Sequence, residues 1–358
     1  MSPATSRKRI PVAVLGATGA VGQMFIRLLA DHPWFELAEL AASERSAGRK
    51  YCEAAHWIGS DDIPSAVRDK TVLGCEPRSV SSPIVFSALD ASVARDVEAA
   101  FAQAGRLVLS NAKCFRMDDD VPLVIPEVNA DHLALLDVQR RLRGWRGGIV
   151  TNANCSSIVA VMALAPLHRA FGVSRLFVST MQAVSGAGYP GVPSLDILGN
   201  VIPFIRDEEG KIQTEILKML GRLDGDRVIP APTRISAHAN RVPVENGHTI
   251  CMSLDFEREV TPDQAIAAMR DWTGDPSCRS LPSAPVRALF VTDEPDRPQP
   301  RRDVDRGGRM TVTVGRVRED PLFSVKLVAV GHNTVRGAAG ASVLNAELLV
   351  ASGRAGVA

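Results

Sequence analysis

The feature that most constrains this chain is a glycine-rich turn between an apolar segment and a helical one. From Pro11 the sequence reads PVAVLGATGAVGQMFIRLLADHP, where β-branched residues precede the turn and apolar residues at helical spacing follow it as far as Pro33. The GxxGxxG spacing is a variant of the dinucleotide-binding fingerprint, in which missing side chains let a pyrophosphate approach a helix N-terminus. We therefore predict dinucleotide binding, against the alternative of a turn that holds no ligand. The predicted contact residues are Gly16, Ala17, Thr18, Gly19, Ala20, Val21 and Gly22.

A polar turn, AASERSAGRK, follows the next expected strand, FELAELAAS. This position usually faces the adenosine ribose, where an acid suits the 2′-hydroxyl of NAD and a cation with hydroxyls suits the 2′-phosphate of NADP. Ser43, Arg45 and Ser46 favour NADP, whereas Glu44 among them fits NAD and a plain polar turn would bind neither. We predict NADP as the cofactor.

The order of the remaining segments indicates two domains of an α/β protein. Strand candidates PIVFSAL, RLVLSN and GGIVTNAN alternate with helical segments, as in a parallel sheet buried on both faces. After Cys155 a helix leads into longer, alternating strands such as HTICMSLDF, which predict an α+β domain with a mostly antiparallel sheet. We expect a Rossmann-type domain over residues 1–153, joined by a C-terminal helix over 335–358, and a second domain over 154–334. The stretch DEPDRPQPRRDVDRGG is expected to be an exposed loop.

Charge and composition exclude several classes of protein. The chain has 41 Lys and Arg against 40 Asp and Glu, so no global field attracts nucleic acid or an anionic membrane. No stretch reaches about 18 apolar residues, and the opening MSPATSRKRI has no apolar signal-peptide core, so we expect a cytoplasmic protein with small-molecule or protein partners. Six cysteines without a CxxC pair predict free thiols and no metal site.

Cys155 is the candidate nucleophile. In TNANCSS it lies where a strand ends and an apolar helix begins, a position that lowers the pKa of a thiol and stabilises its thiolate. Asn154 and the amides of the turn could donate to a developing oxyanion. A cysteine among small residues is also a common buried structural thiol, and sequence chemistry does not choose a base among the seven histidines.

Four separated segments together resemble the aspartate-semialdehyde dehydrogenases: GATGAVG, SNAKCFRMDDDVPLVIPEVN, NANCSS with QAVSGAGYPG, and RVPVENGH. The resemblance spans nearly the whole chain, and QAVSGAGYPG and RPQPRRDVDRGGRMTVTVGRVR are similar to the archaeal and fungal branch. It implies NADPH-dependent reduction of aspartyl-4-phosphate to aspartate-4-semialdehyde through a Cys155 thioester, in the biosynthesis of aspartate-family amino acids. It also implies that the second domain is catalytic and pairs subunits in a homodimer or homotetramer.

The resemblance implies a role for individual residues. Cys155 would be the nucleophile, His248 the acid/base and Gln182 the residue that orients the acyl intermediate. Substrate contacts would come from Arg241 to the α-carboxylate, Glu208 to the amino group, Lys211 and Arg116 to the phosphate, with Asn111 and Asn154 as further donors. Ser185, Gly186 and Asn333 would complete the cofactor site.

Several of these residues have a plainer interpretation as well. His248, which follows the turn VENG and begins a strand, could be a surface or capping histidine. Arg241 could be a solvated charge, and Asn333 a helix N-cap. Glu208 and Lys211 could form an exposed ion pair within one helix.

Two other functions remain open. A malonyl-CoA reductase on the same scaffold would also use a cysteine thioester but needs no amino-group site, so Glu208 discriminates between the two. An NADP-binding redox sensor would keep the fold without turnover. N-acetyl-glutamyl-phosphate reductase and glyceraldehyde-3-phosphate dehydrogenase match the motifs less closely.

Overall fold

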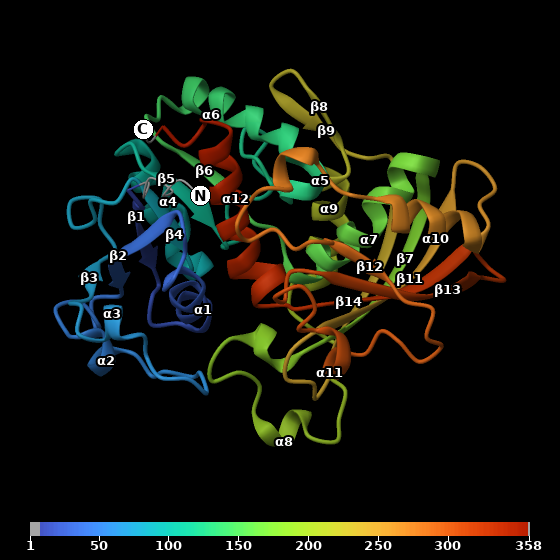
Figure 1. Cartoon of the computed structure of the whole chain (residues 1–358), viewed down its shortest axis with the longest axis horizontal. Coiled ribbons are helices and arrows are strands. Elements are labelled where there is room, and N and C mark those ends of the chain that lie inside the picture. The colour runs from blue at the N-terminus through green and yellow to red at the C-terminus, as the bar shows by residue number, and fades with distance from the viewer. Residues whose placement is uncertain (1–7, 357–358) are drawn as a thin grey trace, which may run out of the picture.

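The computed structural model of the chain describes residues 8–356 and contains a six-stranded parallel sheet in its first part. The strand order is β3-β2-β1-β4-β5-β6, as in a dinucleotide-binding fold (Figure 1). Its strands are β1 (Ile10–Leu15), β2 (Phe35–Ala42), β3 (Leu73–Gly74), β4 (Ile84–Ser87), β5 (Leu107–Ser110) and β6 (Gly148–Thr151). Both faces are largely buried, which explains why most strand residues are apolar instead of alternating with polar ones; the exposed Glu36 of β2 is an exception.

Helices cover both faces of this sheet. On one face, α1 (Ala20–Leu29) and α12 (Gly340–Ala351) share a core with β1 and β5, and on the other α4 (Ala91–Gln103) packs on the same strands. The C-terminal helix thus returns to the first sheet. The remaining helices of this part are α2 (Tyr51–Ala54), α3 (Ser65–Arg68), α5 (Pro126–Asn129) and α6 (Leu135–Arg143). Between residues 8 and 356, no helix combines the length and the apolarity that crossing a membrane requires.

The second sheet is mixed, with order β10-β7-β11-β14-β13-β12. Its three central pairings are antiparallel, as predicted, and the two edge pairings are parallel. The strands are β7 (Val173–Gln182), β10 (Arg234–Arg241), β11 (His248–Phe256), β12 (Leu289–Val291), β13 (Val312–Glu319) and β14 (Val325–Gly331). One face is covered by α7 (Cys155–Phe171), α9 (Glu208–Met219) and α10 (Pro262–Asp271). The hairpin β8 (Arg222–Asp224) and β9 (Arg227–Ile229) and the short helix α8 (Ser194–Ile197) lie outside the sheet.

We propose a domain division at residues 153/154 and 334/335, between the two sheets and just before the C-terminal helical segment. The outermost residues of the first domain, 1–7 and 357–358, lie outside the described part of the chain.

The segment over residues 293–308 is not the wholly exposed loop that its composition predicts. It contains the short helix α11 (Pro300–Asp303), and Asp303 is buried. The Asp303 carboxylate accepts hydrogen bonds from Arg297 Nε at 2.8 Å and from the Gln299 amide at 2.7 Å. Pairing of a buried carboxylate with nearby arginines therefore anchors the segment, and composition alone does not reveal such pairing.

Candidate active site

Cys155 is the first residue of α7, directly after the turn that follows β6. Asn154 caps this helix, because its Oδ1 accepts hydrogen bonds from the amides of Ser156 at 3.0 Å and Ser157 at 3.2 Å. Gly337 lies against the thiol residue: a Cβ at position 337 would come within 2.6 Å of Cys155 Cβ. The cap and this close packing fix the thiol at the helix N-terminus, where the sequence predicts it.

His248 is the histidine that contacts the thiol. It is the first residue of β11 and is buried, and its Nε2 lies 3.1 Å from Cys155 Sγ. The amide of Ala183 donates to His248 Nδ1 at 3.1 Å. In a neutral imidazole one nitrogen accepts and the other carries the proton, so this contact assigns the proton to Nε2, which faces the sulfur.

The protonation states differ from those that the sequence predicts. Burial, followed by the nearby Glu208 carboxylate, raises the pKa of Cys155 to about 12, although Arg116 and Arg241 oppose this shift. Burial and the Arg241 charge lower the pKa of His248 to about 3. The expected lowering of the thiol pKa by the helix N-terminus is therefore wrong for this site, because desolvation outweighs the helix dipole. At neutral pH the pair is a thiol and a neutral imidazole.

A buried cation and a buried anion flank this pair. Arg241, the last residue of β10, donates from Nη1 to the Ala183 carbonyl at 2.8 Å and forms no ion pair with any residue between 8 and 356. A Cβ on Gly186 would lie 3.0 Å from Arg241 Nη1 and 3.1 Å from His248 Cε1, so Gly186 keeps open the space between these two side chains. Arg241 is thus not the solvated charge of the plainer interpretation.

Glu208 opens α9 and points into the protein. Its Oε1 accepts from Asn154 Nδ2 at 2.8 Å and from Gln182 Nε2 at 3.0 Å, and its Oε2 lies 3.3 Å from Lys211 Nζ. The ion pair within the helix exists, but Glu208 is only 4% exposed. Because the side-chain amides of Asn154 and Gln182 donate to Glu208, neither is directed at an oxyanion; the predicted donor role of Asn154 does not fit this arrangement.

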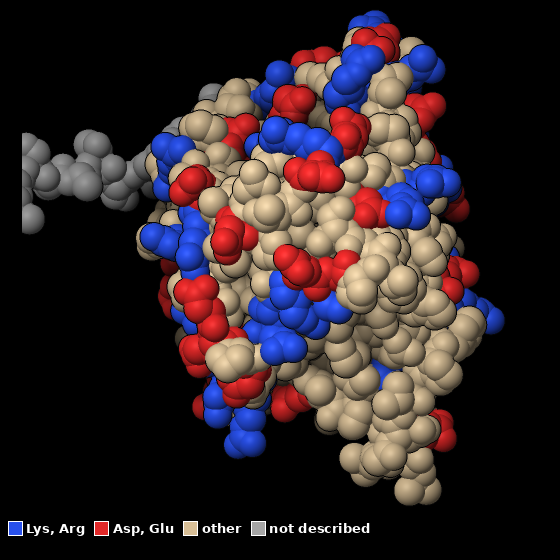
Figure 2. Space-filling model, turned by 90° about the vertical axis from the view of Figure 1, so that its right-hand side faces the viewer, with Lys and Arg blue, Asp and Glu red and all other residues tan. Residues whose placement is uncertain are grey.

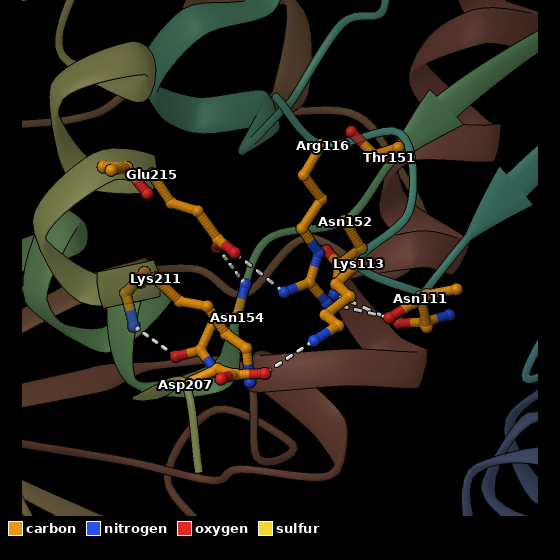
Figure 3. Close-up of polar contacts among 12 residues, drawn as sticks. Asn111, Lys113, Arg116, Thr151, Asn152, Asn154, Asp207, Lys211 and Glu215 are labelled. Carbon is orange, nitrogen blue, oxygen red and sulfur yellow. Dashed lines mark hydrogen bonds and ion pairs between the residues drawn. The ribbon is translucent and has the colours of Figure 1, made fainter. Parts of the chain in front are cut away.

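Arg116 follows β5 and reaches across to α9. It donates from Nη1 to Glu215 Oε1 at 2.9 Å and from Nη2 to the Asn111 carbonyl at 2.8 Å (Figure 3). The Asn111 side chain turns inward instead of joining Arg116: its Nδ2 donates to the Ser87 carbonyl at 3.3 Å and its Oδ1 accepts from Asn152 at 3.2 Å. Asn111 therefore supports Arg116 through its backbone, which corrects its predicted role as a side-chain donor.

Sequence reasoning missed several residues of this region. They are Glu215, Lys218, Lys113, Asp207 and Gly337. Lys113 Nζ lies 2.7 Å from Asp207 Oδ2, and this pair joins the loop after β5 to the start of α9 (Figure 3). The continued helical spacing after Glu208 and Lys211 was the one sequence signal for Glu215 and Lys218.

The glycine-rich turn fits a dinucleotide pyrophosphate. Gly16 has φ +72°, and a Cβ there would lie 2.5 Å from the Ala88 carbonyl oxygen, whereas a Cβ on Gly19 would meet nothing closer than 3.5 Å. No side chain caps α1, so its first amides are free for an anion. Ala17 instead lies beneath the turn, since its amide donates to the Ala41 carbonyl and its carbonyl accepts from Tyr51 Oη. It supports the turn and is not placed to touch a ligand.

The other predicted cofactor residues fall into two groups. Ser43 and Arg45 are exposed in the turn after β2 together with Glu44, whereas Ser46 is buried. Asn333 does not cap a helix: its Nδ2 donates to Ser185 Oγ at 2.8 Å and its Oδ1 accepts from the Gly247 amide at 2.9 Å. Asn333 thus joins the loop before α8 to the residue that precedes His248.

Comparisons with known proteins agree with this geometry. Two family models match: the semialdehyde dehydrogenase NAD binding domain over residues 11–136 and the semialdehyde dehydrogenase dimerisation domain over residues 164–336. The aspartate-semialdehyde dehydrogenase of Archaeoglobus fulgidus is 52% identical over 342 residues, which are 96% of this chain and 98% of that protein. The enzyme of the same name from Cryptococcus neoformans is 47% identical over 365 residues, 99% of each chain.

The fold also matches solved structures. The crystal structure of aspartate semialdehyde dehydrogenase with NADP from Candida albicans superposes with a TM-score of 0.90 at 41% identity, covering 97% of this chain and 100% of that chain. Relatives at 46% identity or more include archaeal and fungal enzymes, which agrees with the branch-specific segments. The chain belongs to the aspartate-semialdehyde dehydrogenase family.

Proposed function

We propose that this protein catalyses the reversible, NADPH-dependent reductive dephosphorylation of L-aspartyl-4-phosphate to L-aspartate-4-semialdehyde, in the biosynthesis of aspartate-family amino acids. One observation carries the assignment: the Cys155 and His248 pair lies between a buried carboxylate and a buried arginine that has no carboxylate partner within residues 8–356. The aspartate-semialdehyde dehydrogenase of Candida albicans was crystallised with NADP, which supports the same cofactor here.

The two flanking charges match the α-amino acid end of the substrate. The Arg241 guanidinium is planar and binds a carboxylate through two hydrogen bonds, so it would hold the α-carboxylate. Glu208 would receive the ammonium group, replacing part of its contact with Lys211. Malonyl-CoA has no ammonium group, so the burial of Glu208 beside the thiol favours the aspartyl substrate over that alternative.

In the first step Cys155 Sγ attacks the acyl carbon of aspartyl-4-phosphate. The C–S bond of the thioester forms, the bond from the acyl carbon to the phosphate oxygen breaks, and the thiol proton leaves with the phosphate. Arg116 and Lys211 would hold the departing dianion, because their carboxylate partners, Glu215 and Glu208, both accept hydrogen bonds from Asn154, the residue before Cys155. Covalent attachment divides one difficult displacement into two easier steps.

For the second step NADPH, when bound, would supply the hydride that reduces the thioester. The cradle for its pyrophosphate is the turn from Gly16 to Gly22, and Ser43 with Arg45 would meet the 2′-phosphate. His248 Nε2–H then donates a hydrogen bond to the oxyanion of the thiohemiacetal. When the C–S bond breaks, the carbonyl reforms and the sulfur leaves as a thiolate that accepts the same N–H.

Glu208 has a second effect on this chemistry. Its charge is one cause of the raised pKa of the Cys155 thiol. A substrate ammonium that pairs with Glu208 neutralises this charge and so favours the thiolate at the moment when the acyl carbon is in place. The substrate thereby promotes formation of the nucleophile that attacks it.

The mechanism requires that Cys155 is a free thiol, which favours a reducing compartment. We therefore place the enzyme in the cytoplasm.

We further propose that the protein is a homodimer, in which a second copy covers the exposed apolar segment around α8. The matching family model is described as a dimerisation domain. The segment around α8 exposes five large hydrophobic side chains, and Figure 2 shows few charged groups on the lowest part of the molecule, where Figure 1 places this segment. These side chains are Tyr189, Leu195, Leu198, Val201 and Phe204. An apolar patch of this kind marks an interface.

The reaction is tested by the reduction of NADP with aspartate semialdehyde. We expect rapid turnover that vanishes when phosphate is omitted, because phosphate must release the acyl group from Cys155. NADPH oxidation with malonyl-CoA and the use of NAD serve as comparisons. Turnover with malonyl-CoA alone would assign the rival substrate, and no turnover with either would support the redox sensor.

The effect of Glu208 on the thiol is tested with Glu208→Gln. Removing the carboxylate charge should lower the pKa of Cys155, and each unit raises the thiolate fraction about tenfold while the thiol predominates. Iodoacetamide should therefore alkylate Cys155 faster in the variant at a given pH, although turnover falls. Glu209→Gln is the matched control, since the neighbouring Glu209 is exposed and bonds the Ala239 amide. Unchanged or slower alkylation in Glu208→Gln would refute this role.

The dimer is tested by sedimentation equilibrium with Leu195→Asp. Leu195 is 91% exposed in the single chain, so a carboxylate there should leave the monomer folded and weaken its pairing. Leu142→Asp, on α6 at 65% exposure, is the control and should remain dimeric. A wild-type monomer, or a Leu195→Asp dimer as tight as the wild type, would exclude this interface.

A further inference from the structure

The helix α9 carries four ionisable side chains on one face. Glu208, Lys211, Glu215 and Lys218 follow each other at intervals of three or four residues, which places them one above the other along the helix. The proposed function uses Glu208 and Lys211. Glu215 and Lys218 are more deeply buried than Lys211, yet the proposed mechanism does not use them.

Glu215 joins two parts of the site. Its Oε1 accepts from Arg116 Nη1 at 2.9 Å, and its Oε2 accepts from the backbone amide of Asn154 at 2.6 Å (Figure 3). Arg116 belongs to the loop after β5, whereas Asn154 caps α7 and directly precedes Cys155. One carboxylate therefore links the proposed phosphate-binding arginine to the backbone that presents the nucleophile.

Lys218 holds the backbone of the same loop. Its Nζ donates to the carbonyls of Arg116 at 2.8 Å, Asp118 at 2.8 Å and Val121 at 2.9 Å. An ammonium group has three donors, so each of them is used. Burial lowers the pKa of Lys218 to about 8, and the carbonyl oxygens compensate the charge that remains buried at neutral pH.

The contacts with Glu215 and Asn111 use two of the five N–H groups of Arg116. Glu215 and the Asn111 carbonyl each take an N–H from a different terminal nitrogen, and Arg116 Nε is buried with no partner among residues 8–356. A guanidinium binds phosphate in two-point fashion through N–H groups on one edge. With the Glu215 and Asn111 contacts in place, the remaining N–H groups of Arg116 are the ones left for an anion oxygen.

We propose that Glu215 is a positioning residue, which orients Arg116 for the phosphate and ties it to the nucleophile turn, and that Lys218 fixes the loop that carries Arg116. The inference rests on the proposed function, because it concerns phosphate. Both partners of Glu215 are donors, so two acceptor oxygens are required. A glutamine offers only one acceptor and would set its NH2 group against an N–H.

A role of Glu215 through its charge and a role through its position predict opposite changes in the KM for phosphate. A carboxylate near the phosphate site repels the anion, so if Glu215 acted by charge alone, Glu215→Gln would lower the KM for phosphate. Glu215→Asp keeps the charge, but its side chain is one methylene shorter. Its carboxylate should therefore not reach Arg116 and the Asn154 amide together. Positioning predicts that both variants raise the KM for phosphate.

The experiment measures phosphate-dependent NADP reduction with aspartate semialdehyde for both variants and for the control Glu209→Gln. We expect the KM for phosphate to rise about tenfold or more in Glu215→Gln and Glu215→Asp, the effect of losing a hydrogen bond to a charged group. The KM for NADP should stay unchanged, and Glu209→Gln should behave as the wild type. An unchanged or lower KM for phosphate in Glu215→Asp overturns the proposal.

A double-mutant cycle separates positioning from a general structural defect. If Glu215 acts through Arg116, the double variant Glu215→Asp with Arg116→Lys should bind phosphate no worse than Arg116→Lys alone. Additive losses would contradict the proposal even if both single variants are impaired. Failure of the proposed function is distinguishable, since in that case the wild-type enzyme itself shows no phosphate-dependent turnover.

Discussion

The site depends on the contacts of one residue, Asn154. Its Oδ1 caps α7, its Nδ2 donates to Glu208, and its backbone amide donates to Glu215. The cap fixes where the helix begins and hence where Cys155 lies, while the two carboxylates bind α9 to the same turn. The turn that holds Asn154 follows the last strand of the first sheet, whereas α9 packs on the second sheet. The contacts of Asn154 with α9 therefore fix the positions of the thiol, Glu208 and Arg116 relative to one another.

The charged side chains around the thiol would gain their missing partners from the charged groups of the substrate. Among the described residues Arg241 has no carboxylate partner and Arg116 Nε has no acceptor, so each arginine would gain a partner from an anionic group. Burial raises the pKa of the Cys155 thiol, and the Glu208 charge adds to this effect until an ammonium group pairs with Glu208. His248 is held by the Ala183 amide in the form that donates from Nε2, so it meets a thiolate or an oxyanion with a proton already in place.

The sequence predicted those features that depend on neighbouring residues. The turn from Gly16 to Gly22 and the thiol at a strand-to-helix junction are local patterns in the sequence. The alternation of strands and helices predicted both sheets, and the family resemblance predicted the residues around Cys155. Contacts made by packing were missed. The inward turn of Asn111, the task of Glu215 and the raised pKa of Cys155 depend on which distant groups surround them, and helical spacing or a helix terminus does not specify those neighbours.

The central claim, that Cys155 carries the acyl group, is tested most directly by intact-protein and peptide mass spectrometry. Enzyme mixed with aspartate semialdehyde and NADP in the absence of phosphate should hold an aspartyl thioester on Cys155, because the acceptor that releases it is missing. Adding phosphate should remove the adduct, and Cys155→Ala should not form it. An enzyme that turns over with Cys155 unmodified under these conditions, or an adduct on another residue, would contradict the account.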